Sequence, residues 1–139
     1  MLWLIKRGLV SDLDVQRREE RRRPLSFTLA GMLITVLGLW LTAAPALLLA
    51  VGAAQLIQTA VALAITLRWK ISMHGAASAA CAALLVFLLG LQAAPVLAAV
   101  PLVAWAHVHL QRHTPLQTIA GAALGGLVTW GVLAWHTLI

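Results

Sequence analysis

Long apolar segments constrain this chain more than any other feature of its sequence. Hydrophobic residues make up 62% of its 139 residues and charged residues 10%, whereas soluble domains are about half apolar and a quarter charged. Because a membrane-spanning helix needs roughly 20 apolar residues, the sequence predicts an all-α, polytopic transmembrane helical bundle of about five spans. The expected spans are Leu25–Thr42, Pro45–Leu67, His74–Leu91, Pro95–Leu110 and Pro115–Trp135.

The few charged residues predict how this bundle is oriented. The net charge is +6, and seven of the ten cations lie within residues 1–23 together with all four acids. The other cations, Arg68, Lys70 and Arg112, fall in the second and fourth breaks between the segments, while the first and third breaks are uncharged. Since cytoplasmic loops carry an excess of Lys and Arg, we expect a multi-pass protein of the cell membrane with a cytoplasmic N-terminus. Basic residues beside a membrane indicate anionic lipid as partner rather than nucleic acid.

The same pattern divides the chain into two parts. Residues 1–23 form a predicted basic, interfacial N-terminal tail, and residues 24–139 form the transmembrane domain. The short apolar run Leu2–Ile5 is typical of a segment that lies at the membrane interface. Pro24 suits the first turn of a helix, where its missing N–H costs nothing. The uncharged breaks, at 43–45 and 92–95, are expected to be turns on the side opposite the basic breaks.

Small and polar residues within the segments predict helix packing. Gly, Ala and Ser fill positions 75–80 and, apart from Leu124, positions 121–126, and the second run contains the GxxxG pair Gly121 and Gly125. Helices in a membrane associate through such small residues, because lipid gives apolar side chains no reason to leave it. Gln55 and Gln58 share one helix face and are expected to form interhelical hydrogen bonds. With a single cysteine, Cys81, no disulfide framework is expected within the chain.

Ionisable and hydroxyl side chains gather at the ends of segments that should meet the basic face. Topology would bring them to one side of the membrane, where ionisable groups at the edge of a bundle usually line a cavity. Positive charge and several donors in one pocket favour binding of a phosphoryl group. On a helix, His107 and His109 point away from each other, so at most one of them is expected to join His113 in this pocket, and His109 is expected to face the interface. The residues concerned are Ser72, His74, His107, His109, Arg112 and His113, with Arg68, Lys70 and the arginines before Pro24, including Arg23.

Two separated motifs in this region resemble those of the type 2 phosphatidic acid phosphatases, the PAP2 superfamily. Ser72 and His74 keep the Ser-x-His spacing of the family's Pro-Ser-Gly-His motif. His113 falls where the motif Ser-Arg-x5-His-x3-Asp places its histidine, and Arg23-Pro24 matches the end of Lys-x6-Arg-Pro. The resemblance covers approximately Arg68 to Gly126, and it implies a membrane-embedded phosphatase that needs no metal or other cofactor.

The resemblance also implies a role for each residue. His113 would be the catalytic nucleophile that forms a phosphohistidine, and His74 would be the general acid. Imidazole suits both tasks because its protonation changes near neutral pH. The implied substrate is a lipid phosphate or a polyprenyl diphosphate. The implied phosphate-binding residues are Ser72, Lys70, His107 and Arg23.

Two positions depart from the family pattern and leave alternatives open. Ala106-His107 stands where the family has Ser-Arg, and Gln117 stands where it has Asp. Gln117 is therefore expected to orient His113 without the charge of a carboxylate. One alternative is a catalytically degenerate PAP2-like protein that binds lipid headgroups or a membrane partner. Another is a haem- or metal-binding bundle, suggested by the histidine spacing. Association with further copies of the chain is left open.

Overall fold

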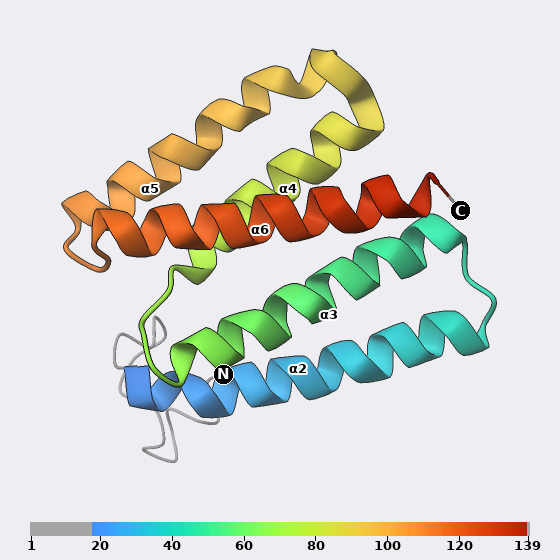
Figure 1. Cartoon of the computed structure of the whole chain (residues 1–139), viewed down its shortest axis with the longest axis horizontal. Coiled ribbons are helices and arrows are strands. Elements are labelled where there is room, and N and C mark those ends of the chain that lie inside the picture. The colour runs from blue at the N-terminus through green and yellow to red at the C-terminus, as the bar shows by residue number, and fades with distance from the viewer. Residues whose placement is uncertain (1–17, 139) are drawn as a thin grey trace.

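The computed structural model describes residues 18–138, which form a bundle of helices (Figure 1). No strand occurs in this part of the chain. Four stretches are long and apolar enough to cross a membrane, namely Arg22–Leu41, Ala46–Thr66, Met73–His109 and Pro115–His136. The predicted helical membrane bundle is therefore confirmed. The elements are α2 (Arg18–Leu41), α3 (Ala46–Thr66), α4 (Met73–Leu89), the 3₁₀ helix η1 (Gly90–Ala98), α5 (Ala99–His109) and α6 (Pro115–His136).

The third of these stretches folds back on itself. Its 37 residues would extend about 55 Å as a straight helix, nearly twice the roughly 30 Å of a bilayer's hydrocarbon core. The ring of His74, in the first turn of α4, stacks on that of His107, in the last turn of α5, with centroids 4.6 Å apart. Helices α4 and α5 therefore run in opposite directions, joined at the far end by η1 (Figure 1). This hairpin covers the predicted third and fourth spans, His74–Leu91 and Pro95–Leu110, with α5 shorter than expected.

The predicted open turn at 92–95 is wrong in detail. This segment lies inside η1, and α5 begins at Ala99 rather than at Pro95. Gly90 ends α4 with a φ of 68°, a conformation that a residue without Cβ adopts readily. The φ of proline, fixed near about −65°, fits a 3₁₀ helix, so Pro95 leaves the backbone helical.

The start of α2 also differs from the prediction. The helix begins at Arg18, so Pro24 lies inside it rather than in its first turn. Arg and Glu are good helix formers, and they extend the helix upstream into residues assigned to the tail. The predicted interfacial run Leu2–Ile5 lies outside the described residues, as does the rest of the tail before Arg18.

Helices α4 and α6 form the most closely packed pair. A Cβ on Gly121 would collide with the carbonyl oxygen of Ser72, and one on Gly125 would collide with that of Ala76. From the first contact to the second, the residue number rises by four on α6 and by four on the α4 side, so the two helices run parallel. The predicted packing through small residues is thereby confirmed, since only glycine lets the two backbones approach this closely.

The glutamines of α3 behave differently from the prediction. Gln58 is buried, but its side-chain oxygen has no hydrogen-bond partner among the described residues. The interhelical hydrogen bond expected of this oxygen is therefore not formed. Gln55 lies half-buried one turn earlier on the same helix.

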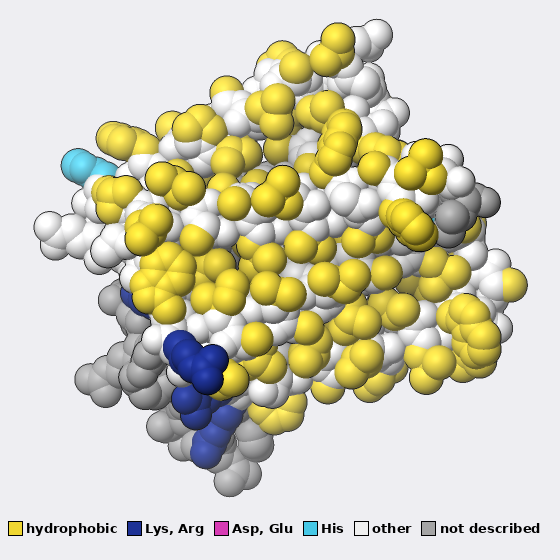
Figure 2. All heavy atoms as spheres, in the orientation of Figure 1, with side chains coloured by type: hydrophobic (Ala, Val, Ile, Leu, Met, Phe, Trp, Pro, Cys, Tyr) yellow, Lys and Arg dark blue, Asp and Glu magenta, His cyan; other side chains and the backbone are white. Residues whose placement is uncertain are grey.

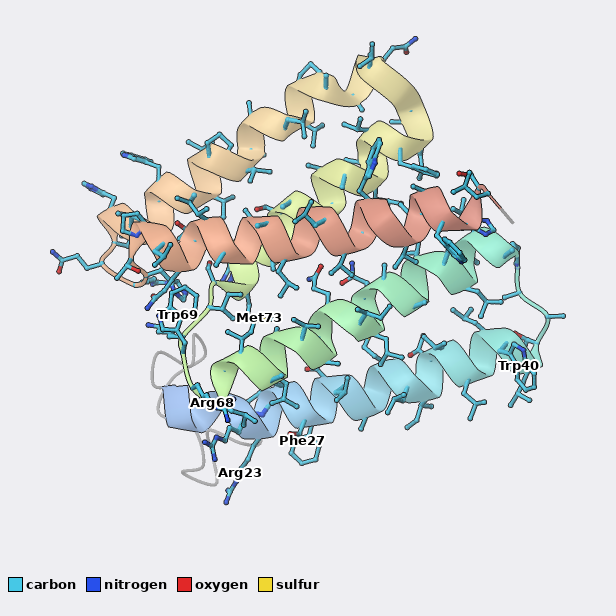
Figure 3. The ribbon with its side chains drawn as sticks, in the orientation of Figure 1. Arg23, Phe27, Trp40, Arg68, Trp69 and Met73 are labelled. Atoms are coloured by element: carbon cyan, nitrogen blue, oxygen red, sulfur yellow. The ribbon has the colours of Figure 1, made fainter. Side chains whose placement is uncertain are left out.

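The two ends of the bundle differ in charge. Apolar side chains cover most of the face seen in Figure 2, and cations gather at one end beside the start of α2. Arg23, Arg68 and Trp69 lie at this end and Trp40 lies at the other (Figure 3). We call the first the basic end, because it also holds the α3–α4 loop, with Lys70, and the α5–α6 loop, with Arg112. The predicted alternation of basic and uncharged breaks is confirmed.

Candidate functional site

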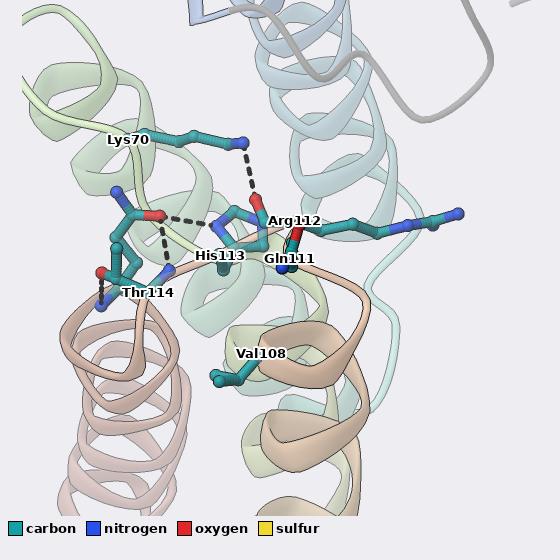
Figure 4. Close-up of a pocket in the computed structure, with 7 residues that line it drawn as sticks. Lys70, Val108, Gln111, Arg112, His113 and Thr114 are labelled. Atoms are coloured by element: carbon teal, nitrogen blue, oxygen red, sulfur yellow. Dashed lines mark hydrogen bonds between the residues drawn. The ribbon is translucent and has the colours of Figure 1, made fainter.

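Two loops carry the residues singled out by the sequence, and hydrogen bonds join these loops at the basic end. The α3–α4 loop covers residues 67–72 and the α5–α6 loop covers residues 110–114. The Nζ atom of Lys70 donates to the carbonyl oxygen of Arg112 at 2.7 Å (Figure 4). The backbone N–H of Ser72 donates to the carbonyl of Gln117 at 3.2 Å. The starts of α4 and α6 are thus fixed relative to each other.

A tight turn places His113 between α5 and α6. The backbone N–H groups of Arg112 and His113 both donate to the carbonyl oxygen of His107, at 3.0 and 3.3 Å. Gln111 has a φ of 53°, the left-handed conformation with which many helices end. This turn reverses the chain within a few residues, and His113 is buried directly before α6.

Gln117 fixes the imidazole of His113. The Nδ1 atom of His113 lies 3.1 Å from Oε1 of Gln117. The same oxygen accepts the backbone N–H of Thr114 at 3.2 Å. Because a backbone N–H can only donate, the shared atom must be the amide oxygen, and His113 must then donate from Nδ1. In a neutral imidazole the lone pair is consequently on Nε2. The orienting role expected of Gln117 agrees with this geometry.

Three histidine rings form a continuous row that we call the histidine stack: His74, His107 and His113. His74 lies 4.6 Å from His107 between centroids, with an interplanar angle of 29°. His107 lies 5.8 Å from His113, with an angle of 59°. His109 faces elsewhere, is exposed and stacks on Trp105 at 5.2 Å. Of the two α5 histidines, His107 contacts His113, although it is not among the residues that line the pocket described below.

A pocket of about 430 Å³ opens beside His113. Its two cationic side chains come from the two joined loops, and the first turn of α6 forms another wall, so the pocket meets the positive end of a helix dipole. The lining residues are Lys70, Val108, Gln111, Arg112, His113, Thr114 and Gln117 (Figure 4). Positive charge, a fixed imidazole and hydrogen-bonding side chains together suit an anionic, oxygen-rich ligand.

The structure brings some of the predicted site residues together and separates others. Lys70, His113 and Gln117 line the pocket, and His107 lies beside His113 in the stack. His74 is exposed and reaches this region through its contact with His107. Ser72 is fully buried, and its Oγ accepts the backbone N–H of Gly75 as the cap of α4. Its predicted phosphate contact stays a prediction.

Arg23 lies apart from this group. It is exposed on α2, and its side chain points away from the bundle near Arg68 (Figure 3). Helix α2 packs against α3, and no α2 residue is among those that line the pocket. Arg23 shares the basic end with the pocket but is not one of its walls.

Several pocket residues were not predicted as site residues. Arg112 was expected at the cationic pocket without a specific role, and Gln111 and Thr114, which were not expected there, line it as well. Thr114 could have been found, because Thr114-Pro115-x-Gln117 is a capping-box pattern with proline at the first helical position. The structure contains this capping box. Gln111 carries no comparable signal, since its place depends on how the α5–α6 turn closes.

Within residues 18–138, no group of three or more His, Cys, Asp or Glu side chains is arranged to hold a metal ion. His74 and His107 stack ring on ring, which is not how imidazoles converge on a metal.

The chain matches no family model, no curated protein and no solved structure.

Proposed function

We propose that this protein is a membrane-embedded phosphatase of the PAP2 type, which hydrolyses a lipid phosphate or a polyprenyl diphosphate through a phosphohistidine. The observation that carries the proposal is the hydrogen bond between His113 Nδ1 and Gln117 Oε1, 3.1 Å long, beside a cationic pocket. It keeps the lone pair of the neutral ring on Nε2, as an attacking imidazole requires. Lys70 and Arg112 supply positive charge on the walls of the same pocket.

The proposed reaction has two steps. Nε2 of His113 attacks phosphorus, and the bond from phosphorus to the lipid oxygen breaks as an acid protonates that oxygen. Water then attacks the phosphohistidine, the P–N bond breaks, and inorganic phosphate leaves while the proton released by water restores the acid. The resemblance to the PAP2 superfamily implies that this acid is His74, which belongs to the histidine stack. Charge that develops on the phosphoryl oxygens would be stabilised by the cationic walls.

A second candidate is a headgroup-binding protein without turnover. The nature of Gln117 favours it, because an amide oxygen orients an imidazole but carries no charge to stabilise the cation formed on attack. The same pocket would then hold a lipid phosphate headgroup reversibly. Both candidates share the chemistry of the bound group and differ in whether a bond is broken.

The proposal includes a location. The protein would lie in the cell membrane with its basic end, and therefore the pocket, on the cytoplasmic side. The support is the gathering of Arg23, Arg68, Lys70 and Arg112 at that end, because positive residues are retained on the cytoplasmic side. Membrane lipids and a lipid phosphate are the proposed partners.

Phosphate release from reconstituted protein tests the proposal. Vesicles containing the protein should release inorganic phosphate from phosphatidic acid or from a polyprenyl diphosphate, and vanadate should inhibit this release. His113→Ala should lower turnover by about 10³-fold or more, since it removes the nucleophile. His109→Ala is the matched control, because His109 is exposed and stacks on Trp105 away from the pocket.

The outcomes separate the two candidates. Equal activity of His113→Ala and His109→Ala would exclude His113 as the nucleophile. Binding of phosphatidic acid that His113→Ala weakens, with no phosphate released by the unchanged protein, would identify the headgroup-binding candidate instead.

A further inference from the structure

His74 and His107 do not occupy equivalent places at the site. His74 is exposed, and its ring contacts that of His107, which in turn contacts the ring of His113. His107 is half-buried and contacts both neighbours in the stack. We propose that His107 donates the proton to the leaving lipid oxygen, and that His74 is a positioning residue acting through it. This inference rests on the proposed phosphatase function.

The backbone keeps His107 beside the nucleophile. Its carbonyl oxygen accepts the N–H groups of Arg112 and His113, so the end of α5 and the nucleophile belong to one hydrogen-bonded turn. The two ring centroids are 5.8 Å apart. Since a hydrogen bond spans about 2.8 Å, a leaving oxygen that lies across phosphorus from Nε2 of His113, on the side of His107, would be within reach of the His107 ring. The proposal therefore places the lipid oxygen on that side of the phosphoryl group.

The chemistry of imidazole favours proton transfer over simple phosphate binding as the role of His107. A guanidinium or an ammonium group binds phosphate more strongly, but neither gives up its proton readily near neutral pH. Two stronger cations, Lys70 and Arg112, already line the pocket. A third phosphate-binding cation would add little there, whereas an alkoxide leaving group gains greatly from protonation.

The proton balance closes over one turnover. His107 enters as the imidazolium and gives its proton to the lipid oxygen as the P–O bond breaks and the P–N bond to His113 forms. Neutral His107 then takes a proton from the water that attacks phosphorus, as the P–N bond breaks and phosphate leaves. No other reactant is needed, and His107 returns to its starting state. The stacked ring of His74 fixes the orientation of His107 during both steps.

The leaving group provides a test that separates proton donation from binding. Reconstituted protein is assayed with dioctanoyl phosphatidic acid, whose alcohol leaves only when protonated, and with p-nitrophenyl phosphate, whose phenolate leaves without a proton. His107→Gln should lose about 100-fold in kcat with phosphatidic acid and less than about threefold with the aryl phosphate. His74→Gln should show the same selectivity with a smaller loss, about 10-fold. His109→Gln, on the same helix, should keep both activities.

His107→Arg is a second variant, which restores a phosphate-binding cation but not a proton donor. It should remain as impaired with phosphatidic acid as His107→Gln. Full activity of His107→Arg, or an equal loss with both substrates in His107→Gln, would overturn the inference and leave His107 as a phosphate ligand. Retained aryl phosphatase activity shows that each variant is folded. Failure of the unchanged protein to hydrolyse either substrate would instead contradict the proposed phosphatase function itself.

Discussion

Gln117 serves two purposes through one oxygen atom. Its Oε1 accepts the backbone N–H of Thr114, which completes the capping box of α6, and it also accepts Nδ1–H of His113. The start of the helix and the orientation of the proposed nucleophile therefore depend on the same side chain. A substitution here changes stability and turnover together, and the two effects have to be separated by a second variant.

Replacing Gln117 by glutamate should raise turnover. Gln117→Glu keeps the side-chain length and the capping box, and it places a carboxylate against His113 Nδ1. Because a carboxylate stabilises the cation formed on attack, we expect phosphate release from phosphatidic acid to rise about 10-fold. Turnover equal to or below that of the unchanged protein would show that charge at this position does not limit the reaction.

Removing the Gln117 oxygen should have the opposite effect. Gln117→Leu should lower turnover at least about 10-fold and lower the free energy of unfolding by about 1 kcal/mol through loss of the cap. Thr114→Ala is the matched control, since it removes the hydroxyl that accepts the N–H of Gln117 but leaves Gln117 beside His113. It should lose similar stability and keep its turnover. Equal turnover in the two variants would contradict the orienting role.

The sequence was informative about single residues where the relation is local. The contact between His113 and Gln117 was expected from the family resemblance, and it joins residues only four positions apart. The capping pattern of Thr114 is equally local, although it was not among the predictions. The stacking of His74 on His107 was not predictable, because it depends on how α4 and α5 align across η1, and hydropathy does not specify that alignment.

At the scale of elements, the α4–α6 pair depends on two glycines of α6. A Cβ at Gly121 or Gly125 would meet a backbone carbonyl of the α4 region, which cannot move aside as a flexible side chain can. Gly131 lies on the same helix, and a Cβ there would meet nothing within 4 Å. One helix thus contains two sites that forbid a methyl group and one that accepts it.

Alanine substitutions should reveal this difference in thermal unfolding measured in detergent. We expect Gly121→Ala and Gly125→Ala to lower the free energy of unfolding by about 2 kcal/mol or more, because the helices must separate to admit the methyl group. Gly131→Ala should raise it by about 0.5–1 kcal/mol, because alanine is a better helix former than glycine. Similar destabilisation by all three substitutions would show that the close approach is not specific to the α4 contact.

Most helices of the bundle were predicted from the sequence. The errors concern helix boundaries, where neither the length of an apolar segment nor its residue types indicated the end of the helix. Segment ends followed from apolar length and from the breaks between apolar segments, as at Pro115, where α6 begins. Pro24 and Pro95 were read as boundaries, yet both lie inside helical segments. Proline fixes one dihedral and removes one hydrogen bond, so it marks a local constraint rather than the end of an element.

For the whole molecule, the distribution of charge predicts its orientation in the membrane. Cys81 is exposed on α4, so it is first replaced by Ser. Gln92 and Leu110 are exposed near opposite ends of the α4–α5 hairpin, and each is then changed to Cys in that background. A membrane-impermeant maleimide added to intact cells should label Gln92→Cys, and it should label Leu110→Cys only after the cells are disrupted. The reverse pattern would place the pocket on the outer side.

Helices α2 and α6 differ in how much of each is buried. In the apolar stretch of α2, 6% of residues are buried, against 28% in that of α6. Most substitutions on α2 exchange one lipid contact for another, whereas at Gly121 and Gly125 every substitution adds atoms where none fit. Over evolutionary time α2 is therefore free to diverge until little besides its hydropathy persists. Distant kinship with this chain should be sought in the α4 and α6 segments, where the backbone contact tolerates the fewest changes.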